Sequence, residues 1–172
     1  MPDPNALVAG EALIDMFPTS TGPLPDVERF ERRAGGAPAN LAVAMSRLRE
    51  APYLWTKLGS DPFGQHLESV LTAQDIPAEY IQIDSDRKTA LTLVGDDPES
   101  DQSFVFYKEG TATMAMELGT VPDSVLEEIE WVHFGGEMLC EERPRPAMLD
   151  LAERAKKAGY IVSFDPNTRE DL

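Results

Sequence analysis

The run GGAPAN at residues 35–40 constrains the fold of this chain more than any other stretch of its sequence. Its adjacent glycines let the main chain approach a ligand closely and adopt torsion angles that are closed to other residues. Pro38 suits the first turn of a helix, and the apolar residues of 41–48 recur at helical spacing. Asn40 offers both a hydrogen-bond donor and an acceptor. The run therefore predicts either a site for a small polyhydroxylated molecule or a turn that simply begins an amphipathic helix.

Short apolar segments alternate with segments of helical periodicity along most of the chain. The predicted strands cover residues 6–14, 53–58, 131–134 and 161–164, and the predicted helices cover residues 38–50, 63–74, 122–130 and 144–158. Residues 80–83, 89–94 and 103–107 are short β-branched or aromatic runs separated by acidic turns, a pattern typical of antiparallel strands. The alternation predicts an α/β fold with an open, mostly parallel sheet covered by helices, plus a small β appendage.

In open sheets of this kind, ligands bind outside the carboxyl ends of the strands. Asp15 follows the predicted strand at residues 6–14, Gly135 and Gly136 follow that at 131–134, and residues 165–169 follow that at 161–164. The sequence therefore predicts that these residues meet at one edge of the sheet.

The composition excludes several classes of function. With 172 residues and 42% apolar content, the chain can form a globular domain with a hydrophobic core. Its formal net charge of -16 disfavours binding to nucleic acid and to anionic membrane surfaces. The single cysteine, Cys140, cannot form an internal disulfide, and no apolar run is long enough to span a bilayer. These features, and the absence of a secretory signal pattern, predict a cytoplasmic location.

Four ordered segments carry a resemblance to a known family. Residues 10–15 (GEALID), 35–40 (GGAPAN), 58–64 (LGSDPFG) and 164–169 (FDPNTR) together resemble the amino-terminal half of the ribokinase-like sugar kinases, the phosphofructokinase-B family, and within it the fructokinase branch. The resemblance implies a three-layer α/β/α core with a β-sheet lid over the sugar, and it places the lid near residues 17–34 and 89–107. The family's Gly-Ala-Gly-Asp turn, which carries the catalytic aspartate, occurs nowhere in this sequence.

We therefore expect residues 1–172 to be the amino-terminal part of a sugar kinase domain whose carboxyl-terminal ATP-binding part is absent. On this expectation the chain contains no catalytic base and transfers no phosphate alone. The resemblance implies transfer of the γ-phosphoryl group of ATP to a sugar hydroxyl with Mg²⁺, and we expect no metal site among these residues. Fructose is the first expectation for the acceptor. The alternatives are 2-keto-3-deoxygluconate, a nucleoside, or a non-catalytic sugar-binding or assembly module on the same fold.

The resemblance assigns sugar-binding roles to four residues in the first part of the chain. Asp15 matches a family aspartate that binds sugar hydroxyls, and a carboxylate can accept hydrogen bonds from two neighbouring hydroxyls. Asn40 matches another sugar ligand, while Gly35 and Gly36 match the glycines that turn backbone amides toward the sugar. The alternative is that Asp15 caps a strand end and that residues 35–40 only begin a helix.

Four later residues complete the predicted site. Tyr107 offers an aromatic face to the C–H side of a sugar, and Lys108 stands where related fructokinases often carry arginine. Asn167 is expected on the side of the nucleotide phosphates and Arg169 beside the sugar or the transferred phosphate. The alternatives are a solvated lysine, and a Pro-Asn turn with a surface salt bridge. A homodimer through the lid is a further expectation, because lid strands leave exposed edges.

Overall fold

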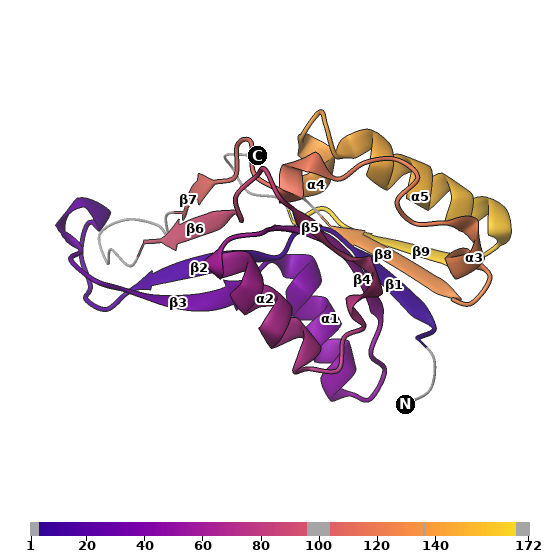
Figure 1. The fold of residues 1–172 in the computed structure, drawn as a ribbon, viewed down its shortest axis with the longest axis horizontal. Coiled ribbons are helices and arrows are strands. Elements are labelled where there is room, and N and C mark those ends of the chain that lie inside the picture. Colours follow the sequence, from indigo (N-terminus) through magenta and orange to yellow (C-terminus); the bar gives the residue numbers. More distant parts are fainter. Residues whose placement is uncertain (1–3, 96–103, 136, 168–172) are drawn as a thin grey trace.

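A computed structural model describes residues 4–95, 104–135 and 137–167. Its larger sheet is five-stranded, with the order β5-β4-β1-β8-β9, and every neighbouring pair is parallel (Figure 1). These strands are β1 (Ala6–Ala9), β4 (Tyr53–Gly59), β5 (Ile81–Asp84), β8 (Trp131–Gly135) and β9 (Ile161–Asp165). The predicted α/β fold with a mostly parallel sheet is confirmed.

A second, smaller sheet is four-stranded and mixed, with the order β3-β2-β6-β7. Its strands are β2 (Leu13–Pro18), β3 (Phe30–Gly35), β6 (Leu91–Val94) and β7 (Phe104–Tyr107). The β2 and β6 strands are parallel, whereas β2 and β3, and likewise β6 and β7, are antiparallel. In Figure 1 this sheet projects to one side of the larger sheet.

Helices cover both faces of the larger sheet (Figure 1). One face carries α1 (Ala37–Arg47) and α2 (Pro62–Thr72), and the other carries α3 (Asp123–Leu126), α4 (Glu137–Cys140) and α5 (Arg145–Ala158). Single turns of 3₁₀ helix occur at η1 (Leu24–Asp26), η2 (Ala78–Tyr80) and η3 (Thr113–Ala115). No helix within the described ranges is long and apolar enough to cross a membrane.

The hydrophobic core forms two clusters, one on each face of the larger sheet, because successive side chains of its strands point to opposite faces. Leu7 and Trp55 pack toward α5, where they join Leu151. Val8 and Leu54, the sequence neighbours of those strand residues, pack toward α1 and α2. Because successive side chains of a strand point to opposite faces, a strand that is buried on both sides reads as a continuous apolar run.

The predicted strand at residues 6–14 is wrong, because the chain changes sheet within it. It leaves the larger sheet after Ala9 and enters the smaller one at Leu13. The break occurs at Gly10, where φ is 148° and where an added Cβ would lie 2.4 Å from Cγ of Pro38. Asp15 therefore lies inside β2 of the smaller sheet and does not follow a strand of the core.

Two further expectations need correction. The sequence pattern places residues 80–83 among the antiparallel strands, but β5 pairs with β4 in parallel because α2 forms the crossover between them. The helix predicted at residues 122–130 is only the single turn of α3. The expected lid segment at residues 89–107 includes 96–103, which lie outside the described residues.

Asp61 joins α2 to the smaller sheet. Its carboxylate accepts hydrogen bonds from the backbone N–H groups of Phe63 (2.9 Å) and Gly64 (3.0 Å) at the start of α2, and from Thr89 (2.7 Å) just before β6. Burial opposes ionisation of Asp61, but these hydrogen bonds outweigh it and lower its pKa. The segment LGSDPFG at residues 58–64 thus has a structural role at the base of the smaller sheet.

Candidate functional site

A cavity of about 140 Å³ lies where the smaller sheet meets the first turn of α1. Its lining residues come from the β1–β2 turn, from three strands of the smaller sheet, from α1 and from the segment after β9: Glu11, Leu13, Asp15, Gly36, Ala37, Asn40, Thr92, Phe104, Phe106 and Asn167. The structure therefore brings Asp15, Gly36, Asn40 and Asn167 together from three separate parts of the sequence. We call this space the acceptor cavity.

Strand register builds one wall of the acceptor cavity. Asp15 of β2 pairs with Thr92 of β6, and Thr92 pairs with Phe106 of β7, so the three residues form a row across the sheet. The ring of Phe104 stacks on that of Phe106 with their centroids 6.0 Å apart. The row therefore places a carboxylate and a hydroxyl beside an aromatic surface, which is the combination that binds both the polar and the C–H sides of a sugar.

A side chain is excluded at both glycines of the GGAPAN run, but by different neighbouring groups. At Gly35, an added Cβ would lie 2.0 Å from Oδ2 of Asp15, so the missing side chain makes room for that carboxylate. At Gly36, φ is 99° and an added Cβ would lie 2.5 Å from the carbonyl oxygen of Glu11. Any larger residue would therefore displace Asp15 or the β1–β2 turn.

Asn40 lies in the first turns of α1, and its backbone N–H donates to the carbonyl oxygen of Gly36 (2.8 Å). Gly36 is the N-cap residue of this helix, and no side chain caps it. The Asn40 side chain is exposed and lines the acceptor cavity. The Asn40 amide therefore does not cap α1.

Thr92 is a cavity residue that the sequence analysis missed. It is 2% exposed, and its Oγ1 has no hydrogen-bond partner among the residues that the structure describes. A buried hydroxyl without a partner is unfavourable by about 1–3 kcal/mol, and a ligand hydroxyl in the cavity would relieve this. The available signal was a threonine at the centre of the apolar run ALTLV at residues 90–94.

Tyr107 and Lys108 do not line the acceptor cavity. Tyr107 is 55% exposed and does not line the acceptor cavity, which β7 faces with Phe104 and Phe106. Arg169 lies outside the described residues. Asn167 has a φ of 42°, and its backbone N–H donates to Oδ1 of Asp165 (2.9 Å), so the predicted turn at the Pro-Asn sequence is present.

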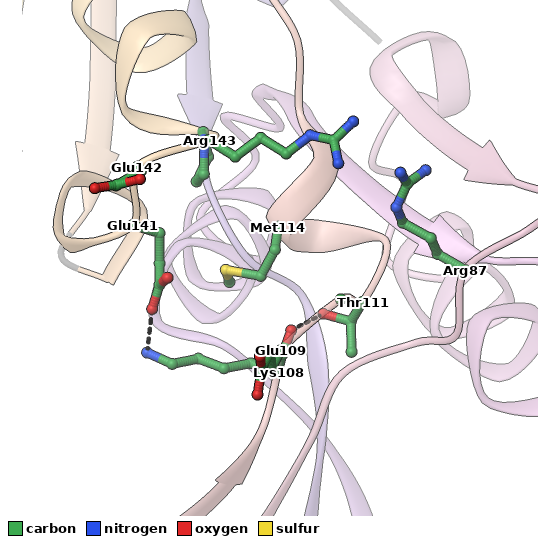
Figure 2. Close-up of a pocket in the computed structure, with 10 residues that line it drawn as sticks. Arg87, Lys108, Glu109, Thr111, Met114, Glu141, Glu142 and Arg143 are labelled. Carbon is green, nitrogen blue, oxygen red and sulfur yellow. Dashed lines mark hydrogen bonds and ion pairs between the residues drawn. The ribbon is translucent and has the colours of Figure 1, made fainter.

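Lys108 lines a second, larger cavity of about 560 Å³ beside η3 and the turn between α4 and α5 (Figure 2). Its Nζ lies 3.2 Å from Oε1 of Glu141 and 5.4 Å from the ring centroid of Phe106. Phe106 lines the acceptor cavity, so Lys108 of the larger cavity contacts a residue of the smaller one.

A buried ionic network supports the segment that leads into β6. Oδ2 of Asp84 lies 3.4 Å from Nζ of Lys57 and 3.1 Å from Nη1 of Arg87, and Oδ1 accepts the backbone N–H groups of Asp86 and Arg87. Burial opposes ionisation of Asp84, but the backbone and side-chain hydrogen bonds outweigh it and lower its pKa to about 2.

The described residues contain no group of three or more His, Cys, Asp or Glu side chains that could hold a metal ion. The Mg²⁺ implied by the family resemblance remains a prediction.

The fold and the cavity define an α/β protein with a helix-covered parallel sheet, a smaller sheet to one side, and a polar cavity between them. The model of the pfkB family carbohydrate kinases matches residues 3–172, and the chain belongs to that family.

Relatives and solved structures agree with this assignment. The chain is 38% identical over 164 residues to probable fructokinase-4 of Arabidopsis thaliana, and the match covers 95% of this chain and 50% of that protein. The crystal structure of an ATP-bound fructokinase from Xylella fastidiosa superposes with a TM-score of 0.85 at 34% identity, covering 98% of this chain and 50% of that one. The fructokinase of Halothermothrix orenii gives a TM-score of 0.89 at 30% identity, covering 97% of this chain and 59% of that one. This chain thus spans about half the length of the curated relatives it matches.

Proposed function

We propose that this chain is the sugar-binding, amino-terminal part of an ATP-dependent sugar kinase whose acceptor is fructose. The observation that carries the proposal is the convergence of Asp15, Asn40 and the buried Thr92 hydroxyl on one cavity. Further support comes from relatives that are named as fructokinases or probable fructokinases. In this proposal residues 1–172 belong to one kinase domain, and the smaller sheet, with the segments near residues 17–34 and 89–107, acts as its lid.

The acceptor cavity would bind the sugar through complementary contacts. The Asp15 carboxylate accepts hydrogen bonds from two adjacent hydroxyls, and the Asn40 amide binds a third. The Thr92 hydroxyl gains a partner that the described residues do not supply. The rings of Phe104 and Phe106 pack against C–H groups and exclude water from the hydroxyls.

Phosphoryl transfer depends mainly on positioning and on neutralisation of charge. ATP is the proposed donor, since matching kinase structures from Xylella fastidiosa and Pyrococcus horikoshii hold ATP. Asn167 is proposed on the nucleotide-phosphate side, and Arg169 beside the acceptor or the transferred phosphate. The base that removes the hydroxyl proton belongs, in this proposal, to the half of the kinase that this chain does not span, so residues 1–172 alone bind sugar weakly and transfer no phosphate.

Several sequence expectations remain predictions. The aromatic role of Tyr107 has no support from its position, whereas Phe104 and Phe106 line the acceptor cavity. The cytoplasmic location and the homodimer through the lid also remain predictions. A neutral sugar suits the cavity better than 2-keto-3-deoxygluconate, because the carboxylate of Glu141 already pairs with Lys108.

The test compares the complete kinase with residues 1–172 in an ATP-coupled assay with fructose. We expect turnover only in the complete kinase. In that protein Asp15→Asn should lower kcat/KM by roughly 10- to 100-fold, because it removes a charge-assisted acceptor worth about 1.5–3 kcal/mol. Asp26→Asn, at an exposed position in η1, is the matched control and should have no effect. Turnover by residues 1–172 alone, or equal effects of the two variants, would contradict the proposal.

A further inference from the structure

We propose that Glu141 sets the charge of the acceptor: by pairing with Lys108 it makes the site select neutral sugars over sugar acids. The inference rests on the proposed function and adds a specificity-determining residue outside the acceptor cavity. Its basis is an ion pair between the end of the smaller sheet and the α4–α5 turn, with Nζ of Lys108 3.2 Å from Oε1 of Glu141 (Figure 2).

The Lys108 ammonium contacts an aromatic residue of the acceptor cavity. It stands 5.4 Å from the ring centroid of Phe106, and that ring lines the cavity. The Lys108 side chain is 17% exposed and that of Glu141 is 38% exposed. Because both are partly shielded from bulk water, their charges act on a nearby ligand with less screening than fully exposed charges would.

Backbone contacts fix both ends of the pair. The carbonyl oxygen of Lys108 accepts hydrogen bonds from the Thr111 hydroxyl (2.6 Å) and from the Thr111 backbone N–H (3.1 Å). On the other side, the Arg145 guanidinium donates to the carbonyl oxygens of Leu139 (2.6 Å) and Cys140 (3.0 Å), which directly precede Glu141. These hydrogen bonds position the backbone at Lys108 and at Glu141 so that the two side chains form an ion pair.

The other two cations of the larger cavity have acidic partners elsewhere. Arg87 pairs with Asp84 at 3.1 Å, and Arg143 pairs with Glu117 at 3.7 Å. Glu141 thus places its negative charge beside the cation that contacts Phe106 of the acceptor cavity. Its neighbour Glu142 lines the same space but forms no ion pair within the described ranges.

This arrangement has a direct consequence for specificity. The carboxylate of a sugar acid in the acceptor cavity is attracted by Lys108 and repelled by Glu141, so the two effects oppose each other. A neutral sugar experiences neither. Replacing Glu141 by glutamine keeps the shape of the side chain and removes one negative charge beside Lys108. The affinity for a sugar acid should therefore rise, while the affinity for a neutral sugar should not change.

The experiment measures dissociation constants of fructose and 2-keto-3-deoxygluconate for the complete kinase by calorimetry. For Glu141→Gln we expect the affinity ratio of acid to fructose to rise about tenfold over that of the wild type. The rise should shrink as ionic strength increases, which a purely structural effect would not do. Glu142→Gln makes the same chemical change one residue away and should leave the ratio unchanged.

A second comparison isolates the cation. In the double variant Lys108→Met with Glu141→Gln, the ratio should return to the wild-type value. The inference is overturned if Glu141→Gln leaves the ratio unchanged, if Glu142→Gln raises it equally, or if the rise survives without Lys108. If the proposed function is wrong, neither the wild type nor any variant will bind fructose. That result is distinct from the three above, and it also overturns the inference.

Discussion

Gly35→Ala tests whether the Asp15 carboxylate occupies the space that the glycine leaves open. The three atoms nearest to an added Cβ all belong to the Asp15 carboxyl group: Oδ2 at 2.0 Å, Cγ at 2.6 Å and Oδ1 at 3.2 Å. Real Cβ atoms do not approach heavy atoms so closely, so the carboxylate must move. Overpacking of this kind destabilises a protein by about 1–3 kcal/mol.

Gly35→Ala should no longer destabilise the protein when the Asp15 carboxylate has already been removed. In an Asp15→Ala background no carboxyl group remains near the added methyl. The backbone of Gly35 lies outside the left-handed region and inside β3, where alanine lowers the entropy of the unfolded chain. Gly35→Ala should then be neutral or stabilising by about 0.5 kcal/mol. The coupling between the two substitutions is therefore expected at about 2 kcal/mol.

Urea unfolding of the complete kinase and its three variants gives this coupling, with fluorescence from Trp55 and Trp131 as the signal. Gly35→Ala should also weaken fructose binding as strongly as Asp15→Ala does, since both remove the carboxylate from its position. An equal loss of stability from Gly35→Ala in both backgrounds would refute the packing of Asp15 against Gly35.

Three further predictions concern the smaller sheet and its base. Thr92→Val should weaken fructose binding about tenfold while keeping or slightly raising stability, because it removes a buried hydroxyl that has no partner among the described residues; calorimetry and urea unfolding measure the two effects. Asp84 has a pKa of about 2, so its contribution of about 2 kcal/mol to the free energy of unfolding is complete above about pH 4 and is lost as the pH falls toward 2. In Asp84→Asn the free energy of unfolding should therefore depend less on pH across this range, as measured by circular dichroism. Asp61→Ala should lower the free energy of unfolding by about 1–2 kcal/mol, because α2 loses its cap and Thr89 loses an acceptor.

Each of these has a contrary outcome. Reduced stability with unchanged fructose affinity in Thr92→Val would make that residue a packing residue only. An unchanged acid transition in Asp84→Asn would show that other carboxylates govern it. Asp26→Ala is the control for Asp61→Ala, since Asp26 is exposed in η1, and equal effects would contradict the role of the cap.

The sequence predicts most strands of the larger sheet well, and its central strands β1, β4 and β8 are largely buried on both sides. Residues 53–58, 131–134 and 161–164 are short apolar runs next to segments of helical period, and each one is a parallel strand in the structure. The same rule failed at residues 6–14. There an apolar run continues across two sheets, and only Gly10 and Glu11 mark the change, so periodicity alone could not separate β1 from β2.

Motifs in the sequence predicted some residues of the candidate site, whereas the other residues are placed there by the register of the strands in the smaller sheet. Asp15, Gly36, Asn40 and Asn167 came from ordered motifs and line one cavity. Thr92 acquires its position from pairing with Asp15 across two parallel strands, which no local pattern reports. The register of β7 likewise decides that Phe106 faces the cavity and its neighbour Tyr107 does not.

A crystal structure of the complete kinase with fructose tests the central claim most directly. The account predicts the sugar in the acceptor cavity, with two adjacent hydroxyls on the Asp15 carboxylate, one on the Asn40 amide and one within hydrogen-bond distance of Thr92 Oγ1. Fructose bound in the larger cavity beside Arg143, with neither Asp15 nor Asn40 in contact with it, would contradict the account.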